Sequence, residues 1–153
     1  MAKPKKFGRG RHRPPGEWVQ TTLAEEVFGL KHREANARAF AAAVEKAERA
    51  GQRYGVALAL QPDNPHDRYA IAVFGQCMVK PFLRTPKLRE WHIGFVEREL
   101  ARELHDDLLS RGIPISSELY SIYKSGKYLE INYIVLAPPG YGHSARTRSD
   151  RSK

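Results

Sequence analysis

Cysteine is almost absent from this sequence: Cys77 is the only one in 153 residues. A single thiol cannot form an intramolecular disulfide or a zinc site built from cysteines. No apolar run is long enough to span a bilayer, and the basic N-terminus lacks the apolar stretch of a secretory signal. These absences predict a cytoplasmic protein without membrane contact, associated with the nucleoid if the cell is bacterial.

Common catalytic motifs are also missing. The sequence has no Gly-rich phosphate loop, no GxSxG and no HExxH. A metal nuclease needs two or more carboxylates that converge on a cation. Asp106 and Asp107 lie in the middle of a predicted helix beside His105, where a solvated face is the simpler interpretation. We therefore expect no enzyme, no catalytic residue, no metal site and no cofactor.

The formal net charge of +9 is confined to the two ends of the chain. Residues 1–16 carry six basic residues and no acid, residues 141–153 carry four basic residues and one acid, and residues 17–140 sum to zero. Both ends are polar and rich in Gly, Pro, Arg or Ser, which predicts disorder. They either attract phosphate over a long range or only solubilise the protein. The prediction is one domain over 17–137, between disordered basic tails at 1–16 and 138–153.

Hydrophobic periodicity predicts two amphipathic helices, over residues 34–50 and 97–111. The first has one apolar stripe and ends at Gly51, and the second repeats Leu100, Leu104 and Leu108. Strands are expected in the β-branched and aromatic runs, namely 18–30 as one or two segments, 54–60, 69–74, 93–96, 114–123 and 128–136. Residues 75–92, rich in cations and prolines, are predicted to form a mobile basic loop. This order favours a small antiparallel sheet that curls into a barrel.

The central stretch of the chain is a rigid polar turn before a buried strand. Pro65 fixes its own φ and holds Asn64 extended, and both Asn64 and Asp67 suit a tight turn. The following residues, 69–74, are apolar and partly β-branched. A polar turn fixed against a core strand holds its side chains in set directions, so it can become a site. The alternative is that the turn only joins two strands.

Four short motifs in sequence order resemble the HIRAN domain, and the resemblance spans roughly residues 27–136. They are Ala57-Leu58-Ala59-Leu60, Asn64-Pro65-His66-Asp67, Ala70-Ile71-Ala72-Val73 and Ile93-Gly94-Phe95-Val96, followed by a helix. The resemblance implies an α+β, mainly β fold: an OB-like curled antiparallel barrel with two packed helices. The family includes small stand-alone bacterial proteins and modules attached to helicase-like and nuclease-like enzymes.

The resemblance also implies a site for the 3′ end of single-stranded DNA. Lys31 matches a family arginine, whereas His32 and Arg33 replace two aromatic residues that stack terminal bases. Asn64 and Asp67 match residues at the terminal sugar. A carboxylate repels phosphate but accepts a hydrogen bond from a hydroxyl, so Asp67 suits a free 3′-OH. The full set of predicted nucleic-acid-binding residues adds members of the central turn and a hairpin aromatic: Lys31, His32, Arg33, Asn64, His66, Asp67, Arg68, Tyr69 and Tyr123.

The favoured function is a module that binds single-stranded DNA in repair, replication or defence, with a helicase or nuclease as a possible partner. One alternative is a protein-interaction adaptor that keeps the barrel without nucleic-acid binding. Another is a metal-dependent nuclease or accessory hydrolase that uses His66 and Asp67. The sequence does not distinguish DNA from RNA, and it leaves the oligomeric state open.

Overall fold

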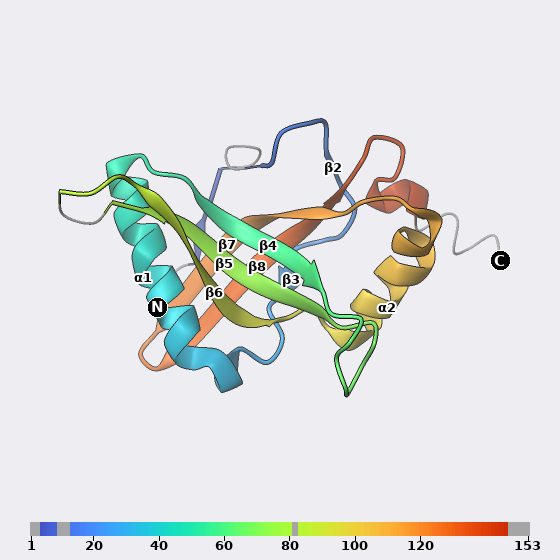
Figure 1. The fold of residues 1–153 in the computed structure, drawn as a ribbon, viewed down its shortest axis with the longest axis horizontal. Helices are drawn as coiled ribbons and strands as arrows, with labels where there is room; N and C mark the ends of the chain where they lie inside the picture. The colour runs from blue at the N-terminus through green and yellow to red at the C-terminus, as the bar shows by residue number, and fades with distance from the viewer. Residues whose placement is uncertain (1–3, 9–12, 81–82, 147–153) are drawn as a thin grey trace.

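Two antiparallel sheets face each other in the computed structural model of the chain, which describes residues 4–8, 13–80 and 83–146 (Figure 1). The larger sheet has the order β1-β7-β8-β2, and β3 also pairs with β8. Its strands are β1 (Lys5–Lys6), β2 (Val19–Gln20), β3 (Glu25–Glu26), β7 (Ser116–Ser125) and β8 (Tyr128–Ala137). The smaller sheet has the order β4-β5-β6, with β4 (Tyr54–Leu60), β5 (Ile71–Val79) and β6 (Lys87–Phe95).

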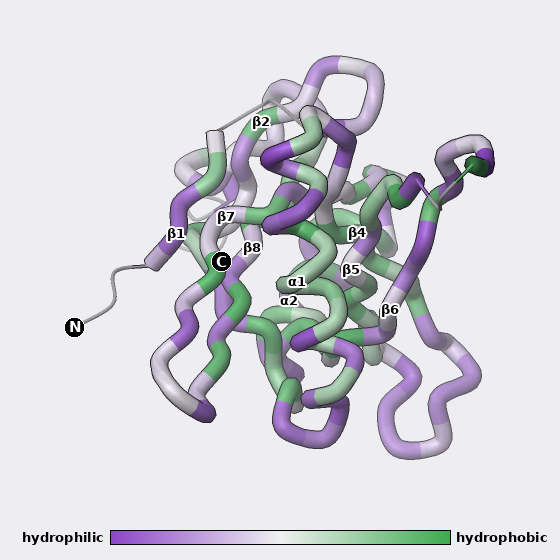
Figure 2. Tube along the Cα trace, turned by 90° about the vertical axis from the view of Figure 1, so that its left-hand side faces the viewer, coloured by the Kyte–Doolittle hydropathy of each residue, from purple (hydrophilic) through white to green (hydrophobic). Residues whose placement is uncertain are grey.

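Helices cover the two ends of this sandwich (Figure 1). They are the 3₁₀ turn η1 (Leu30–Arg33), α1 (Glu34–Ala50), α2 (Arg98–Asp107) and the 3₁₀ turn η2 (Leu109–Arg111). Hydrophobic segments gather in the interior, and the outer turns are hydrophilic (Figure 2). The fold is α+β, mainly β, with a curled antiparallel OB-like half-barrel, which confirms the predicted fold class. No helix in the described ranges is both long and apolar enough to cross a membrane.

Helix α1 has the predicted bounds, and Gly51 ends it in the left-handed conformation at φ 67°. Phe40 from this helix is fully buried and lies 6.1 Å from the ring of Trp91, centroid to centroid. A Cβ on Gly75 would approach Cγ of Phe40 to 2.4 Å, so only glycine lets the helix lie this close to β5. The apolar stripe seen in the sequence is therefore the contact between α1 and the smaller sheet.

Helix α2 begins at the predicted place because Glu97 caps it. The Glu97 carboxylate accepts hydrogen bonds from the backbone N–H groups of Glu99 and Leu100, at 3.1 and 3.0 Å. Such a cap satisfies backbone donors that the first turn leaves without partners. The helix ends at Asp107, and the predicted last turn is the 3₁₀ turn η2. Leu104 and Leu108 are buried, as their spacing predicts.

The prediction of a mobile loop over residues 75–92 is wrong. β5 runs on to Val79 and β6 begins at Lys87, so most of this segment lies in the two strands. Gly75 and Trp91 are paired across the two strands and are both buried on the side that faces α1. This contact with a distant helix stabilises an extended hairpin. The cations and prolines of the segment had indicated a loop instead. Pro81 lies outside the described residues.

The N-terminal tail is also ordered where the structure describes it. β1 pairs with β7, and the backbone N–H of Phe7 donates to the carbonyl of Tyr120 at 3.0 Å. The guanidinium of Arg13 binds both carboxylate oxygens of Glu118, at 2.9 and 3.0 Å. The prediction of a disordered tail is therefore wrong for residues 4–8 and 13–16, and the remaining tail residues, 1–3 and 9–12, lie outside the described ranges.

The C-terminal tail packs through Arg146, whose side chain is 6% exposed. It donates two hydrogen bonds to the carbonyl of Thr21, at 3.2 and 2.9 Å, and pairs with Glu103 and with Asp107, the latter at 3.2 Å. Disorder is thus wrong for residues 138–146, and residues 147–153 lie outside the described part. The solvated face predicted for Asp107 is also wrong, because this carboxylate binds the tail.

A pair of backbone hydrogen bonds joins the two sheets. Phe28 and Phe95 exchange both N–H···O bonds at 2.9 Å, and Phe28 follows β3 of the larger sheet. Gly94 makes this approach possible: a Cβ there would lie 2.5 Å from the carbonyl oxygen of Phe28, and its φ is +156°. This bridge places η1 directly beside the end of β6.

Replacing Gly94 with alanine tests this bridge. We expect Gly94→Ala to lower the free energy of unfolding by about 3 kcal/mol, because the methyl group collides with backbone and φ is unfavourable. Chemical denaturation measures the change. Gly142→Ala is the matched control, because its nearest contact would be an ordinary 3.6 Å. Equal stability of the two variants would contradict the proposed constraint.

Arg146→Ala tests the anchoring of the C-terminal segment. We expect a loss of about 3 kcal/mol, because the substitution leaves a buried carbonyl and a largely buried carboxylate without their cation. Lys124→Ala removes an exposed pair with Glu45 at 4.0 Å and is expected to cost less than about 0.5 kcal/mol. A loss for Arg146→Ala no larger than that for Lys124→Ala would show that the segment is not anchored.

Candidate nucleic-acid interface

The central turn is held by its own asparagine. Oδ1 of Asn64 accepts hydrogen bonds from the backbone N–H groups of His66 and Asp67, at 2.9 and 3.2 Å. Nδ2 of Asn64 donates to Oε1 of Gln61 at 3.0 Å. These bonds form the Asx-type turn that the sequence predicts. The first role of Asn64 is therefore to hold the turn together. His66 is exposed beside it.

Asp67 uses one carboxylate oxygen for structure and directs the other towards a cation. Oδ1 accepts a hydrogen bond from the backbone N–H of Tyr69 at 2.9 Å. Oδ2 lies 3.9 Å from Nε of Arg98, and the Asp67 side chain keeps 20% of its surface exposed. The Arg98 side chain is 81% exposed, so this ion pair is weak and open to water. Because its partner is exposed, Oδ2 is the oxygen of this carboxylate that we expect a ligand to reach.

Three arginines surround the same corner. The guanidinium carbons of Arg68 and Arg102 lie 4.8 and 4.2 Å from the ring centroid of Tyr69. Arg68 also donates to the Tyr69 hydroxyl at 2.7 Å. The rings of Tyr69 and His105 meet edge to face, with centroids 5.1 Å apart. Arg98 and Arg102 are four residues apart on α2, a spacing that places them on one helical face. This spacing was the sequence signal for two cations that the sequence prediction missed.

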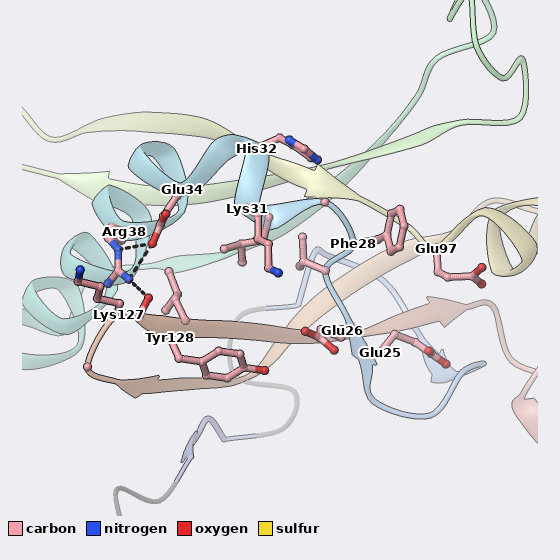
Figure 3. Close-up of a pocket in the computed structure, with 15 residues that line it drawn as sticks. Glu25, Glu26, Phe28, Lys31, His32, Glu34, Arg38, Glu97, Lys127 and Tyr128 are labelled. Carbon is pink, nitrogen blue, oxygen red and sulfur yellow. Dashed lines mark hydrogen bonds and ion pairs between the residues drawn. The ribbon is translucent and has the colours of Figure 1, made fainter.

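The predicted group of Lys31, His32 and Arg33 divides into two parts. Arg33 lies with its guanidinium carbon 5.7 Å from the ring centroid of Phe95. Lys31 and His32 instead line a groove of about 1170 Å³ between η1 and the β7–β8 hairpin. In Figure 3, Lys31 points into this groove and His32 lies at its rim. The three residues predicted to act together thus face two surfaces.

The groove carries mixed charge. Its described walls include four carboxylates, from Glu25, Glu26, Glu34 and Glu97, and its cations are Lys31, Arg38 and Lys127. Figure 3 shows that Arg38 and Lys127 occupy one end with Glu34, whereas Glu25, Glu26 and Glu97 occupy the other. Carboxylates repel phosphate, so the acidic end of this groove is a poor path for a nucleic-acid backbone.

Burial raises the pKa of Glu25, and the neighbouring carboxylates of Glu103 and Glu97 raise it further, while Arg146 partly offsets them. Burial also raises the pKa of Glu26, with Glu130 adding to the shift. Both pKa values are raised mainly because burial disfavours the charged form, and neighbouring carboxylates add to the shift at this end of the groove.

The hairpin aromatics lie opposite Lys31. Tyr123 and Tyr128 meet edge to face with ring centroids 5.8 Å apart. Tyr128 lines the groove and is 51% exposed, whereas Tyr123 does not line it. Of the two hairpin tyrosines, Tyr128 and not the predicted Tyr123 is therefore the one that a ligand in the groove would contact.

The two halves of the predicted site meet at the end of β6. Phe95 contacts Arg33, and Arg98, three residues later, lies beside Asp67. The sequence prediction included neither Phe95 nor Arg98, although these residues connect its two halves. His66 and Asp67 join no metal-binding cluster, because the described ranges contain no group of three or more His, Cys, Asp or Glu side chains that could hold a metal ion.

Comparisons of the chain with protein-family models, curated proteins and solved structures gave no match.

Glu25→Gln tests the uncompensated charge in the groove. Because its pKa is raised in the folded protein, ionised Glu25 destabilises the fold at pH 7. As the pH falls below the raised pKa of Glu25, the folded protein binds a proton there and the natural protein regains this stability. Below the ordinary pKa of 4.5 the unfolded chain is protonated as well, so the gain is complete. We therefore expect Glu25→Gln to raise the urea midpoint at pH 7, with the difference disappearing near pH 4.

The control is Glu17→Gln, which removes an exposed carboxylate outside the groove and is expected to leave the midpoint unchanged. A lower midpoint for Glu25→Gln at pH 7 would mean that Glu25 is stabilised by its surroundings and that the groove is not acidic in excess.

Proposed function

We propose that this protein is a non-enzymatic module of the HIRAN type that binds single-stranded DNA and prefers a free 3′-OH end. The motifs around the central turn and β6 suggest the family, and the OB-like fold agrees with it. OB folds bind single strands by combining a cationic surface with aromatic rings on which bases stack.

The observation that carries this proposal is the corner formed by Phe95, Arg98 and Asp67. Arg33 lies over Phe95 at 5.7 Å, and Arg98 lies 3.9 Å from Asp67, so a ring, two cations and one carboxylate occupy neighbouring positions. A base can stack beside Phe95 and Arg33. The guanidinium of Arg98 can bind the phosphate on the 5′ side of the last nucleotide.

Asp67 gives this corner its preference for an end. Its Oδ2 can accept a hydrogen bond from a 3′-OH, whereas a 3′-phosphate would bring two negative charges together. Since the central turn is rigid, Oδ2 keeps its position before a ligand binds. Arg68 and Arg102 around Tyr69 add positive charge along the same corner.

The acidic end of the groove favours a second candidate, a protein-interaction adaptor. Glu25, Glu26 and Glu97 lie together there, next to the exposed ring of Phe28, which is 60% exposed. Such a surface suits a cationic segment of a protein partner better than a nucleic acid. Absence of oligonucleotide binding at low salt would favour this candidate.

A pair of otherwise identical oligonucleotides tests the first candidate. We expect the protein to bind a strand with a 3′-OH about tenfold more tightly than one with a 3′-phosphate, the scale of one hydrogen bond to a charged group. In Asp67→Asn the preference should shrink towards one, because the carboxylate charge is gone while the side chain can still accept from Tyr69. Fluorescence anisotropy measures both affinities.

Asp63→Asn is the matched control, since Asp63 is an exposed acid in the same loop. It should keep the full preference for the 3′-OH. Equal binding of the two strands by the natural protein, or an unchanged preference in Asp67→Asn, would refute the assignment of Asp67.

A further inference from the structure

The outer face of the β4-β5-β6 sheet carries a row of rings beside a row of small residues. Phe74 on β5 pairs with His92 on β6, and Ala57 on β4 is the partner of Phe74 on its other side. Gly55 and Ala59 lie two residues before and after Ala57, so all three point to the same face. The residue paired with Phe74 on β4 therefore carries only a methyl group.

The rings form a continuous ridge. Phe74 and His92 stack with centroids 4.8 Å apart and planes inclined by 22°. His92 meets Phe95 edge to face at 5.0 Å, and Phe95 contacts Arg33. Burial and the charge of Arg33 lower the pKa of His92, which keeps its ring neutral at pH 7. The ridge thus leads from the Asp67 corner along β6.

This face is open rather than part of the core. The residues that alternate with the ridge, Gly75 and Trp91, face α1 on the opposite side of the sheet. The side chains of Phe74, His92 and Phe95 are all partly exposed. A hollow of about 430 Å³ lies beside the ridge and is lined in part by Gly55, Ala57, Gln76, Met78 and Leu88.

Charge at the two ends of the ridge matches a nucleic-acid backbone. Arg33 and Arg98 lie at the Phe95 end. The exposed cations Lys80, Arg84 and Lys87 lie at the β5–β6 connection, the other end of β6. Glu90 is the one carboxylate on the ring-bearing side of β6, where it pairs with Gln76. At the Phe95 end Arg98 pairs with Asp67 and Arg33 adds a further cation, and at the other end three exposed cations lie together, so a single strand can run along the ridge.

We propose that this outer face is a stacking platform for the nucleotides that precede the bound 3′ end. One base stacks on the free side of Phe74, over Ala57, and the backbone continues towards the cations of the β5–β6 connection. This inference rests on the proposed function, but it concerns a different surface from the Asp67 corner. It makes the binding site several nucleotides long instead of a terminal pocket alone.

Chain length of the ligand is the direct test. We expect the affinity for oligothymidylates with a 3′-OH to rise steeply between two and about six nucleotides, within the range of one OB fold. Phe74→Leu should weaken binding of the six-nucleotide strand about tenfold, the scale of one lost stacked base, and leave dinucleotide binding unchanged. The preference for 3′-OH over 3′-phosphate should remain.

A second variant guards against misfolding. Ala57→Leu fills the space beside Phe74 from the solvent side and should weaken the same long strand while the ring stays in place. Tyr141→Leu is the matched control, because it also removes a partly exposed ring that contacts an arginine. The guanidinium carbon of Arg111 lies 5.7 Å from the centroid of this ring, and neither residue belongs to the sheet that carries the ridge. It should bind every strand as the natural protein does.

The outcomes separate the two proposals. If both platform variants bind the six-nucleotide strand normally while the 3′-OH preference persists, the platform is refuted and the proposed function stands. If the variants lose long-strand binding but the natural protein shows no 3′-OH preference, the platform stands and the assignment of Asp67 fails. If no strand binds at any length, both proposals fall.

Discussion

The two backbone hydrogen bonds between Phe28 and Phe95 are the constraint on which the rest of the structure depends. They connect the segment after β3 to the end of β6, and therefore one sheet to the other. Only glycine at position 94 leaves room for this contact. The bridge fixes where η1 lies, so it also fixes the distance between Arg33 and Phe95. A backbone contact thus positions side chains that come from distant parts of the chain.

The central turn has a structural role, and the proposed function gives it a second role that does not compete with the first. Asn64 and one oxygen of Asp67 are used to hold the turn, and this rigidity keeps the second oxygen of Asp67 in place. Arg98 gives that oxygen a weak, exposed partner that a ligand can displace. For the proposed strand, the acidic end of the large groove would favour a path over the open sheet, because carboxylates repel phosphate.

Local patterns predicted most of the fold. The stripe on α1, the start of α2 at Glu97 and the strands expected at 54–60 and 128–136 rest on short-range signals, and the structure confirms them. The predictions for the loop and the tails failed where long-range contacts determine the structure. Gly75 packs on Phe40 from another element, and Arg146 binds Thr21, 125 residues away. Composition alone made these segments resemble loops and tails. For the same reason the sequence identified Asp67 and Arg33 but missed Phe95 and Arg98, which connect them only in three dimensions.

Binding of a strand end at the end of β6 can be followed by nuclear magnetic resonance during titration with a six-nucleotide strand bearing a 3′-OH. We expect chemical-shift changes at the amides of Asp67 and Arg98 and at the side chains of Arg33 and Phe95, continuing to Phe74 and His92. Changes confined to the groove around Glu25 and Tyr128, or no changes at the end of β6, would contradict this expectation.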